Sequence, residues 1–148
     1  MTEFSQAEMR NVEQSCYALA VEYAEIIDGQ EYARLVEIFA EDAAFVRPTA
    51  PKEPIHGADN IVAMFQARPR NRLTQHLISN FRVRMETMDT AVGTCRVLFF
   101  SSDVSEPETA EGRKAASKQS IGTYHDRYVR TKNGWRIAER IGTMIFYT

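Results

Sequence analysis

The second half of this 148-residue chain consists almost entirely of long strand-like runs, and no other feature constrains the fold as strongly. Four segments alternate apolar with polar residues and are rich in β-branched and aromatic side chains, as half-buried strands are. They are LTQHLISNFRVRM (73–85), TAVGTCRVLFFSS (90–102), SIGTYHDRYVRT (120–131) and GWRIAERIGTMIFY (134–147). The Asn133-Gly134 pair between the last two predicts a tight hairpin turn. We therefore expect four long antiparallel strands.

The first half has helical periodicity instead. Apolar residues recur every three or four positions from Val12 to Ile27, which predicts a long amphipathic helix that ends at Gly29. A short second helix is expected over residues 32–39 and a third over residues 58–68. Three helices thus precede most of the sheet.

The connecting segments complete the expected domain. A short strand, DAAFVRP (42–48), is closed by Pro48 and leads into a proline-rich loop. The polar run over residues 103–119 is expected to be a long mobile hairpin loop and a candidate lid. No repeat or linker divides the chain, so residues 1–148 are interpreted as one α+β domain whose helices cover one face of a strongly bent sheet.

The charge balance excludes some classes of partner. The formal net charge is −2 and the isoelectric point is about 5.9, so no overall field attracts nucleic acid or an anionic membrane. The one basic run, ARPRNR, contains Arg68, Arg70 and Arg72 but no interleaved aromatic residue on which a base could stack. It is interpreted as a solvated helix exit, and nucleic-acid binding is not expected.

Two further features concern location and metal chemistry. The polar start MTEFSQAEMR and the absence of an apolar run of ~20 residues predict a cytoplasmic protein without a membrane span. Cys16 and Cys95 lie in a helical and a strand pattern without the spacing of a metal site. Both are expected to be small buried hydrophobes.

Three segments resemble the SnoaL-like branch of the nuclear transport factor 2-like superfamily: FAEDAAFVRP after a helical hairpin, QHLISN at a strand start, and GTYHDRYVRTKNGWRIAER near the end. The resemblance covers nearly the whole chain. It implies a cone-shaped fold in which three N-terminal helices and a strongly curved, mixed but mainly antiparallel sheet enclose a deep pocket. Scytalone dehydratase, ketosteroid isomerase, polyketide cyclases and bile-acid dehydratase use this pocket for catalysis, and other members only bind.

Asp28, in the stretch VEYAEIIDGQEY, has two interpretations. Because Glu31 follows three residues later, the pair fits a capping box that begins the second helix, and the residues alone favour this role. The resemblance implies another role. Scytalone dehydratase and bile-acid dehydratase carry a Tyr and an Asp around this helix end and a His at the strand that corresponds to QHLISN. Tyr23, Asp28 and His76 occupy those positions here.

These three residue types suit proton transfer. A carboxylate such as Asp28 that accepts from one imidazole nitrogen fixes the tautomer of His76 and leaves the other nitrogen as a base. A tyrosine hydroxyl in a dry pocket donates to a carbonyl oxygen and stabilises the enolate, which is the role assigned to Tyr23. The alternative is that Tyr23 belongs to the apolar stripe of the first helix and that His76 is an ordinary structural residue.

Two departures from the family patterns limit the chemistry. In ketosteroid isomerase the base is an aspartate directly before the proline that closes the first strand, whereas FVRP has Arg47 there. Scytalone dehydratase also uses a second histidine from the strand that corresponds to TCRVLFFSS, and this run contains none. His125 comes one strand later and is interpreted as a surface residue. The ketosteroid mechanism is therefore not expected, and dehydration would depend on one histidine.

Arg140 is a further candidate, either for binding a substrate oxygen or for pairing with Asp28. Simple alternation puts Arg140 and Ile137 on opposite faces of the last strand, and parity alone does not decide which face is concave. The alternative is an ordinary cross-strand ion pair with Asp126. Tyr124 and Asp126 share a face of the preceding strand and are also candidate substrate-binding residues.

The leading hypothesis is a cofactor-independent lyase, such as a dehydratase, or an isomerase. It would act on a small hydrophobic hydroxy-carbonyl compound, polycyclic or aromatic. The alternative is a non-catalytic binding module or a structural subunit of the same fold, like the small subunit of ring-hydroxylating dioxygenases. Apolar residues on both faces of RVLFF favour a homodimer or higher oligomer in either case.

Overall fold

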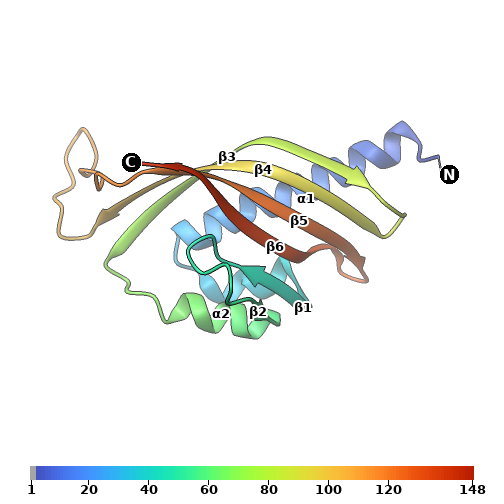
Figure 1. Ribbon diagram of the computed structural model, residues 1–148, viewed down its shortest axis with the longest axis horizontal. Coiled ribbons are helices and arrows are strands. Elements are labelled where there is room, and N and C mark those ends of the chain that lie inside the picture. Colours follow the sequence, from blue (N-terminus) through green and yellow to red (C-terminus); the bar gives the residue numbers. More distant parts are fainter. Residues whose placement is uncertain (1–2) are drawn as a thin grey trace.

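The computed structural model describes residues 3–148 and contains helices followed by a six-stranded sheet (Figure 1). The helices are α1 (Gln6–Asp28), the 3-10 helix η1 (Tyr32–Glu37) and α2 (Ala58–Gln66). The strands are β1 (Phe39–Val46), β2 (Ile55–His56), β3 (Arg72–Met85), β4 (Thr90–Asp103), β5 (Ser120–Thr131) and β6 (Gly134–Tyr147). The expected α+β class and the four long strands are confirmed.

The sheet is mixed but mainly antiparallel. Its strand order is β2-β1-β6-β5-β4-β3, and β1 runs parallel to β6 while every other pair is antiparallel. Figure 1 shows the long strands bending together, with α1 along one face and α2 beside the short strands. The core side chains of the helices and of the curved sheet pack between these layers.

Helix α1 begins with a capping box, although not at the position that the sequence suggested. The Ser5 side chain accepts a hydrogen bond from the Glu8 backbone N–H at 3.2 Å, and the Glu8 carboxylate accepts from the Ser5 N–H at 2.8 Å. Gly29 ends the helix as expected. The second helix is shorter than expected, because Phe39 leaves it to begin β1, where it is buried opposite Ile137.

Aromatic rings fill the interior between α1, β1 and β5. Tyr23 packs edge-on against Phe39, Phe65 and Tyr124, with ring centroids 5.6–6.3 Å apart. Such pairs add roughly 0.5–1.5 kcal/mol each beyond the burial of their area. The core is therefore aromatic where the helices meet the concave side of the sheet.

The two cysteines are free and buried, as expected. Burial raises the pKa of the Cys16 thiol to about 12 and that of Cys95 to about 11. Both thiols therefore stay protonated at neutral pH and behave as small core residues.

A β-bulge in β6 changes which side chains point inward. Tyr128 lies opposite Ile137 and Asp126 lies opposite Arg140, so Ala138 is an extra residue in the ladder. Ile137 and Arg140 consequently share the inner face, and both are fully buried. The expectation that simple alternation separates them was wrong, because it assumed a regular strand.

The segment between β4 and β5 has one isolated bridge, between Thr109 and Gly112. Its return limb is tied back to the sheet, since the Ala116 N–H donates to the Ser101 carbonyl at 2.7 Å. Its mobility and its role as a lid stay predictions. Among the helices of the described residues, none is long and apolar enough to cross a membrane.

Candidate active site

A cavity of about 210 Å³ lies between the N-terminal helices and the inner side of the sheet. Its deep wall is formed by buried aromatic residues, Tyr23 from α1, Phe45 from β1 and Tyr124 from β5. Thr74 and His76 reach it from β3. The cavity thus collects side chains from both halves of the chain.

Asp28 and His76 form the most specific polar contact at this cavity. The His76 Nδ1 lies 2.6 Å from Asp28 Oδ1, and the His76 backbone N–H donates to Oδ2 at 2.7 Å. The Thr74 hydroxyl also donates to Oδ1, at 2.8 Å. Only 12% of the Asp28 side chain and 10% of the His76 side chain are exposed. A carboxylate oxygen accepts hydrogen bonds, so this contact favours the tautomer of a neutral imidazole that has its hydrogen on Nδ1 and its lone pair on Nε2.

The capping role for Asp28 is wrong. Asp28 is the last residue of α1, and the residue that precedes η1 as its cap is Glu31, whose side chain makes no capping hydrogen bond. Because Asp28 is part of α1 and η1 begins only at Tyr32, Asp28 does not occupy the N-cap position of the second helix. The carboxylate instead binds the first residues of β3.

Tyr23 and Tyr124 form part of the cavity wall, and the guanidinium of Arg140 packs against both rings from the core. Their rings are 5.6 Å apart and nearly perpendicular, and the Arg140 guanidinium carbon lies 4.4 Å from the ring centre of Tyr23 and 4.3 Å from that of Tyr124. Burial raises the pKa of Tyr23, although Arg140 opposes this, and burial raises that of Tyr124 well above its ordinary value. Both hydroxyls therefore remain hydrogen-bond donors at neutral pH.

Arg140 and Asp126 form a fully buried ion pair. Arg140 donates from Nε to Oδ1 and from Nη2 to Oδ2 of Asp126, both at 2.8 Å, and the Tyr128 hydroxyl donates to Oδ2 at 2.8 Å. Burial alone would lower the pKa of Arg140, but Asp126 and the hydrogen bonds raise it well above its usual value. Of the two alternatives, the structure therefore has the cross-strand ion pair and no contact between Arg140 and Asp28.

The candidate substrate-binding residues differ in their access to the cavity. Tyr124 lines it, whereas Arg140 and Asp126 do not and instead lie behind Tyr23 and Tyr124. The Arg140 Nη1 atom is buried without a hydrogen-bond partner among the described residues. The ion pair therefore supports the wall of the cavity from within the core.

Four basic residues that sequence reasoning did not assign to the site line the cavity: Arg47, Arg68, Arg72 and Lys118. ARPRNR does follow the end of α2, and Arg72 is exposed as the interpretation of a solvated helix exit requires, but Arg68 is half-buried and both also line the cavity. A signal for Arg72 was available, because it alternates with Thr74 and His76 on the same face of β3. Arg68 lies in the connection before the strand, so no periodicity indicates its direction.

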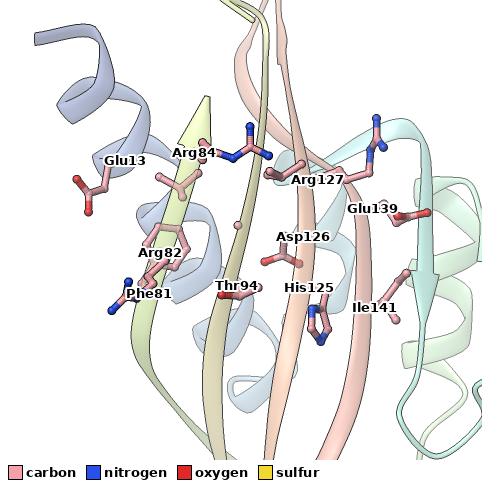
Figure 2. Close-up of a pocket in the computed structure, with 13 residues that line it drawn as sticks. Glu13, Phe81, Arg82, Arg84, Thr94, His125, Asp126, Arg127, Glu139 and Ile141 are labelled. Carbon is pink, nitrogen blue, oxygen red and sulfur yellow. The ribbon is translucent and has the colours of Figure 1, made fainter. Parts of the chain in front are cut away.

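A second, larger hollow of about 660 Å³ lies on the outer side of the sheet. Figure 2 shows His125, Arg127 and Glu139 around it, with α1 on the far side of the strands. His125 is exposed there, and its Nε2 lies 3.3 Å from the Thr143 hydroxyl. The interpretation of His125 as a surface residue is confirmed, and it does not share the cavity of His76.

The described residues contain no group of three or more His, Cys, Asp and Glu side chains placed to hold a metal ion. The groups available at the cavity are one imidazole with a carboxylate behind it, buried tyrosine hydroxyls and guanidinium groups. Such a set can move a proton and stabilise an oxyanion.

The helices, the curved mixed sheet and the enclosed cavity define an α+β cone of the nuclear transport factor 2-like class. The sequence profile of the SnoaL-like domain matches residues 10–141, and the chain belongs to this family. No protein of curated function matches the chain.

Solved structures share this fold at low identity. A provisionally assigned scytalone dehydratase from Novosphingobium aromaticivorans is 18% identical, with a TM-score of 0.79 over 97% of this chain and 91% of that one. A type 3 hexachlorocyclohexane dehydrochlorinase from Novosphingobium barchaimii is also 18% identical, with a TM-score of 0.77 over 97% and 93%. A provisionally assigned aromatic ring hydroxylase from N. aromaticivorans is 22% identical, with a TM-score of 0.72 over 92% and 91%. At these identities the likeness shows the fold alone.

Proposed function

We propose that this protein is a cofactor-independent lyase of the dehydratase kind, or an isomerase, acting on a small aromatic hydroxy-carbonyl compound. The observation that carries the proposal is the 2.6 Å contact between His76 Nδ1 and Asp28 Oδ1, with the His76 ring at the cavity. In this role His76 is the catalytic base, and Asp28 is a positioning residue that holds the ring and stabilises its protonated form.

The reaction begins when the His76 Nε2 lone pair takes a proton from the carbon next to the substrate carbonyl. The electrons of the broken C–H bond move onto the carbonyl oxygen, where the Tyr23 hydroxyl donates to the enolate. When the enolate collapses, a carbon–carbon double bond forms and the β-hydroxyl leaves, taking the proton back from His76 as water. In an isomerase, the same proton returns to a different carbon.

The size of the cavity favours a small substrate. Its volume of about 210 Å³ is below the roughly 300–1,000 Å³ of sites for drug-sized ligands. The aromatic wall of Tyr23, Phe45 and Tyr124 suits a flat ring. A one-ring or two-ring compound therefore fits the proposal better than a four-ring one.

The test is hydrogen exchange catalysed by the protein in deuterium oxide. Mass spectrometry of the native protein identifies any small molecule that copurifies, and this compound and a panel of aromatic hydroxy-ketones and hydroxy-esters are then incubated with it. We expect exchange next to the carbonyl, or loss of water, that His76→Gln abolishes. His125→Gln is the matched control, because it removes an exposed histidine from the outer face, and it should be silent. Exchange that survives His76→Gln would refute the role of His76.

The second candidate function is a non-catalytic binding module or structural subunit. The observation that favours it is a row of apolar residues across the outer face, which the pairing of the strands brings together: Leu77, Leu98, Ile121 and Phe146. Of these, Phe146 is 73% exposed and Leu77 is 57% exposed. Such a row suits contact with another protein chain, and we propose self-association there.

A further inference from the structure

The charged side chains that line the cavity are all positive. The lining residues include three arginines and one lysine, and none of them is an Asp or Glu. Arg72 and Lys118 are exposed, and Arg47 and Arg68 are half-buried, whereas the aromatic residues deeper in the cavity are buried. The cavity therefore has an apolar floor and a cationic entrance.

Three of these four cations, Arg68, Arg72 and Lys118, have no partner of opposite charge among residues 3–148. Within residues 3–148, neither Arg68 nor Arg72 forms an ion pair, whereas Arg47 pairs with the exposed Glu53 at 3.1 Å. The guanidinium of Arg68 stacks 4.2 Å from the Phe65 ring centre. Apolar surface thus holds Arg68 in place without neutralising its charge.

Arg72 has a defined place relative to His76. Its guanidinium lies 5.4 Å from the ring centre of Phe99, and the same ring is 5.0 Å from the imidazole of His76. The cation and the base therefore pack against the same aromatic ring. A substrate that reaches His76 from the entrance passes this cation.

The positive charges of Arg47, Arg68 and Arg72 repel one another. Burial lowers the pKa of Arg68, Tyr23 and Tyr32 oppose this shift, and the nearby charges of Arg72 and Arg47 add to it. A cleft lined by charges of one sign attracts ligands of the opposite sign, so this lining favours an anion. Guanidinium groups bind planar carboxylates through two parallel hydrogen bonds, and they do so more strongly than neutral groups.

We propose that the substrate of this cavity carries a carboxylate, which Arg68 and Arg72 bind at the entrance while its aromatic ring lies against Tyr23, Phe45 and Tyr124. This inference rests on the proposed function, because it names the class of substrate for the same site. Arg47 and Lys118 add positive potential around the carboxylate. The reacting carbon then lies between the entrance and the tyrosines, within reach of His76, and the cationic field also favours the enolate.

The test compares carboxylates with neutral amides of the same shape. Binding of cinnamate, cinnamamide, naphthoate and naphthamide is measured by calorimetry at low and high salt. For the wild type we expect each acid to bind about tenfold or more tightly than its amide, which corresponds to one charge-assisted hydrogen bond. High salt should weaken the acids and leave the amides unchanged. Equal affinities for acid and amide in both pairs would overturn the inference.

Charge-removing variants locate the site. Arg68→Met and Arg72→Met keep an unbranched apolar side chain, and each should reduce the preference for the acid while the affinity for the amide stays. Arg82→Met is the matched control, because it removes an exposed charge from the same strand as Arg72, on the outer side. An unchanged acid preference in both Arg68→Met and Arg72→Met would also overturn the inference.

Different results would refute the proposed function and the anion site. His76→Gln should retain the acid preference, since the base does not hold the carboxylate. An acid preference without any His76-dependent exchange would leave the anion site standing and refute the catalytic proposal. Exchange that depends on His76 but shows no acid preference would refute the anion site alone.

Discussion

Asp28 holds His76 at two points, through the ring at 2.6 Å and through the backbone N–H at 2.7 Å. Its two oxygens accept three hydrogen bonds, the third from Thr74. A carboxylate can do this because both of its oxygens are hydrogen-bond acceptors. An amide offers one carbonyl oxygen and one NH2 group, so it cannot satisfy three donors without turning one of them into an acceptor.

Asp28→Asn is therefore expected to reverse the tautomer of His76. The asparagine carbonyl oxygen would accept from the backbone N–H of His76, which leaves the asparagine NH2 group facing the ring atom Nδ1. Nδ1 must then accept a hydrogen bond from that NH2 group, so the ring proton moves to Nε2. Turnover should fall by about 10³–10⁴-fold, as expected when a base is held in the wrong tautomer. Nitrogen-15 NMR of the ring reads the tautomer directly. Asp42→Asn, at an exposed position of β1, is the control. A ring proton that stays on Nδ1 would count against a tautomer role for Asp28.

Tyr23→Phe should lower turnover with little effect on the fold. The hydroxyl is a buried, protonated donor at the cavity, and loss of one oxyanion donor costs about 10²–10³-fold in kcat. The KM should change less, because the interaction strengthens only as the enolate forms. Tyr17→Phe, on the exposed side of the same helix, is the control. An unchanged kcat would mean that Tyr23 is only part of the core.

The buried ion pair gives a stability prediction. Asp126→Asn leaves Arg140 buried beside a neutral partner, and breaking such a pair costs about 3–5 kcal/mol of the free energy of unfolding. The double variant Asp126→Leu with Arg140→Met removes both charges and should recover much of that loss. Urea unfolding measures both. A loss below about 1 kcal/mol in Asp126→Asn would show that the core tolerates the unpaired cation.

Alkaline pH should unfold the protein cooperatively. Burial raises the pKa of Tyr23, Tyr124 and Tyr128, so these side chains bind protons more tightly in the folded chain than in the unfolded one. Their contribution to stability is complete below the tyrosine pKa of the unfolded state, about 10, and is lost as the pH rises above it. Tyrosinate absorbance followed beside circular dichroism tests this. The three side chains should ionise together with unfolding, and ionisation well before unfolding would contradict the prediction.

Self-association is expected through the apolar row on the outer face. Leu98→Asp and Phe146→Asp place a charge on that row, where desolvating it would oppose contact between two copies. Light scattering should give an oligomer for the wild type and a monomer for these variants. Val104→Asp, exposed in the loop after β4, is the control and should leave the mass unchanged. A monomeric wild type at tens of micromolar, where weak complexes already form, would refute the expectation.

Periodicity predicted the elements of this fold well and the direction of single side chains less well. The long alternating runs of the second half correctly predicted the strands β3 to β6, because apolar and polar residues alternate where one face of a strand is buried. The same parity failed for Arg140, since the bulge at Ala138 shifts the register by one residue and carries no signal in the sequence. Local regularity can be predicted, whereas an inserted residue depends on tertiary packing.

In the candidate site, too, contacts that depend on tertiary packing were not predictable from local sequence patterns. The contact of Asp28 with His76 joins a helix end to a strand far along the chain, and only the family resemblance suggested it, since local rules favoured a cap. Arg68 and Arg72 were interpreted as solvated residues because charge predicts exposure in most cases. Arg72 is indeed exposed, but that interpretation did not place either residue at the cavity. Their place at the cavity follows from how the segment between α2 and β3 crosses the entrance.

The position of β6 between β1 and β5 has a consequence for how the chain reaches this structure. Phe45 of β1 pairs with Arg140 of β6, so the first strand of the chain lies beside the last one in the sheet. Until residues 134–147 have been synthesised, β1 and β5 each present an open edge, and unpaired edges recruit other chains. Closing contacts so distant in sequence is slow. The cavity, which β6 helps to line, therefore forms late, and nascent chains that stall before β6 are the species most exposed to aggregation.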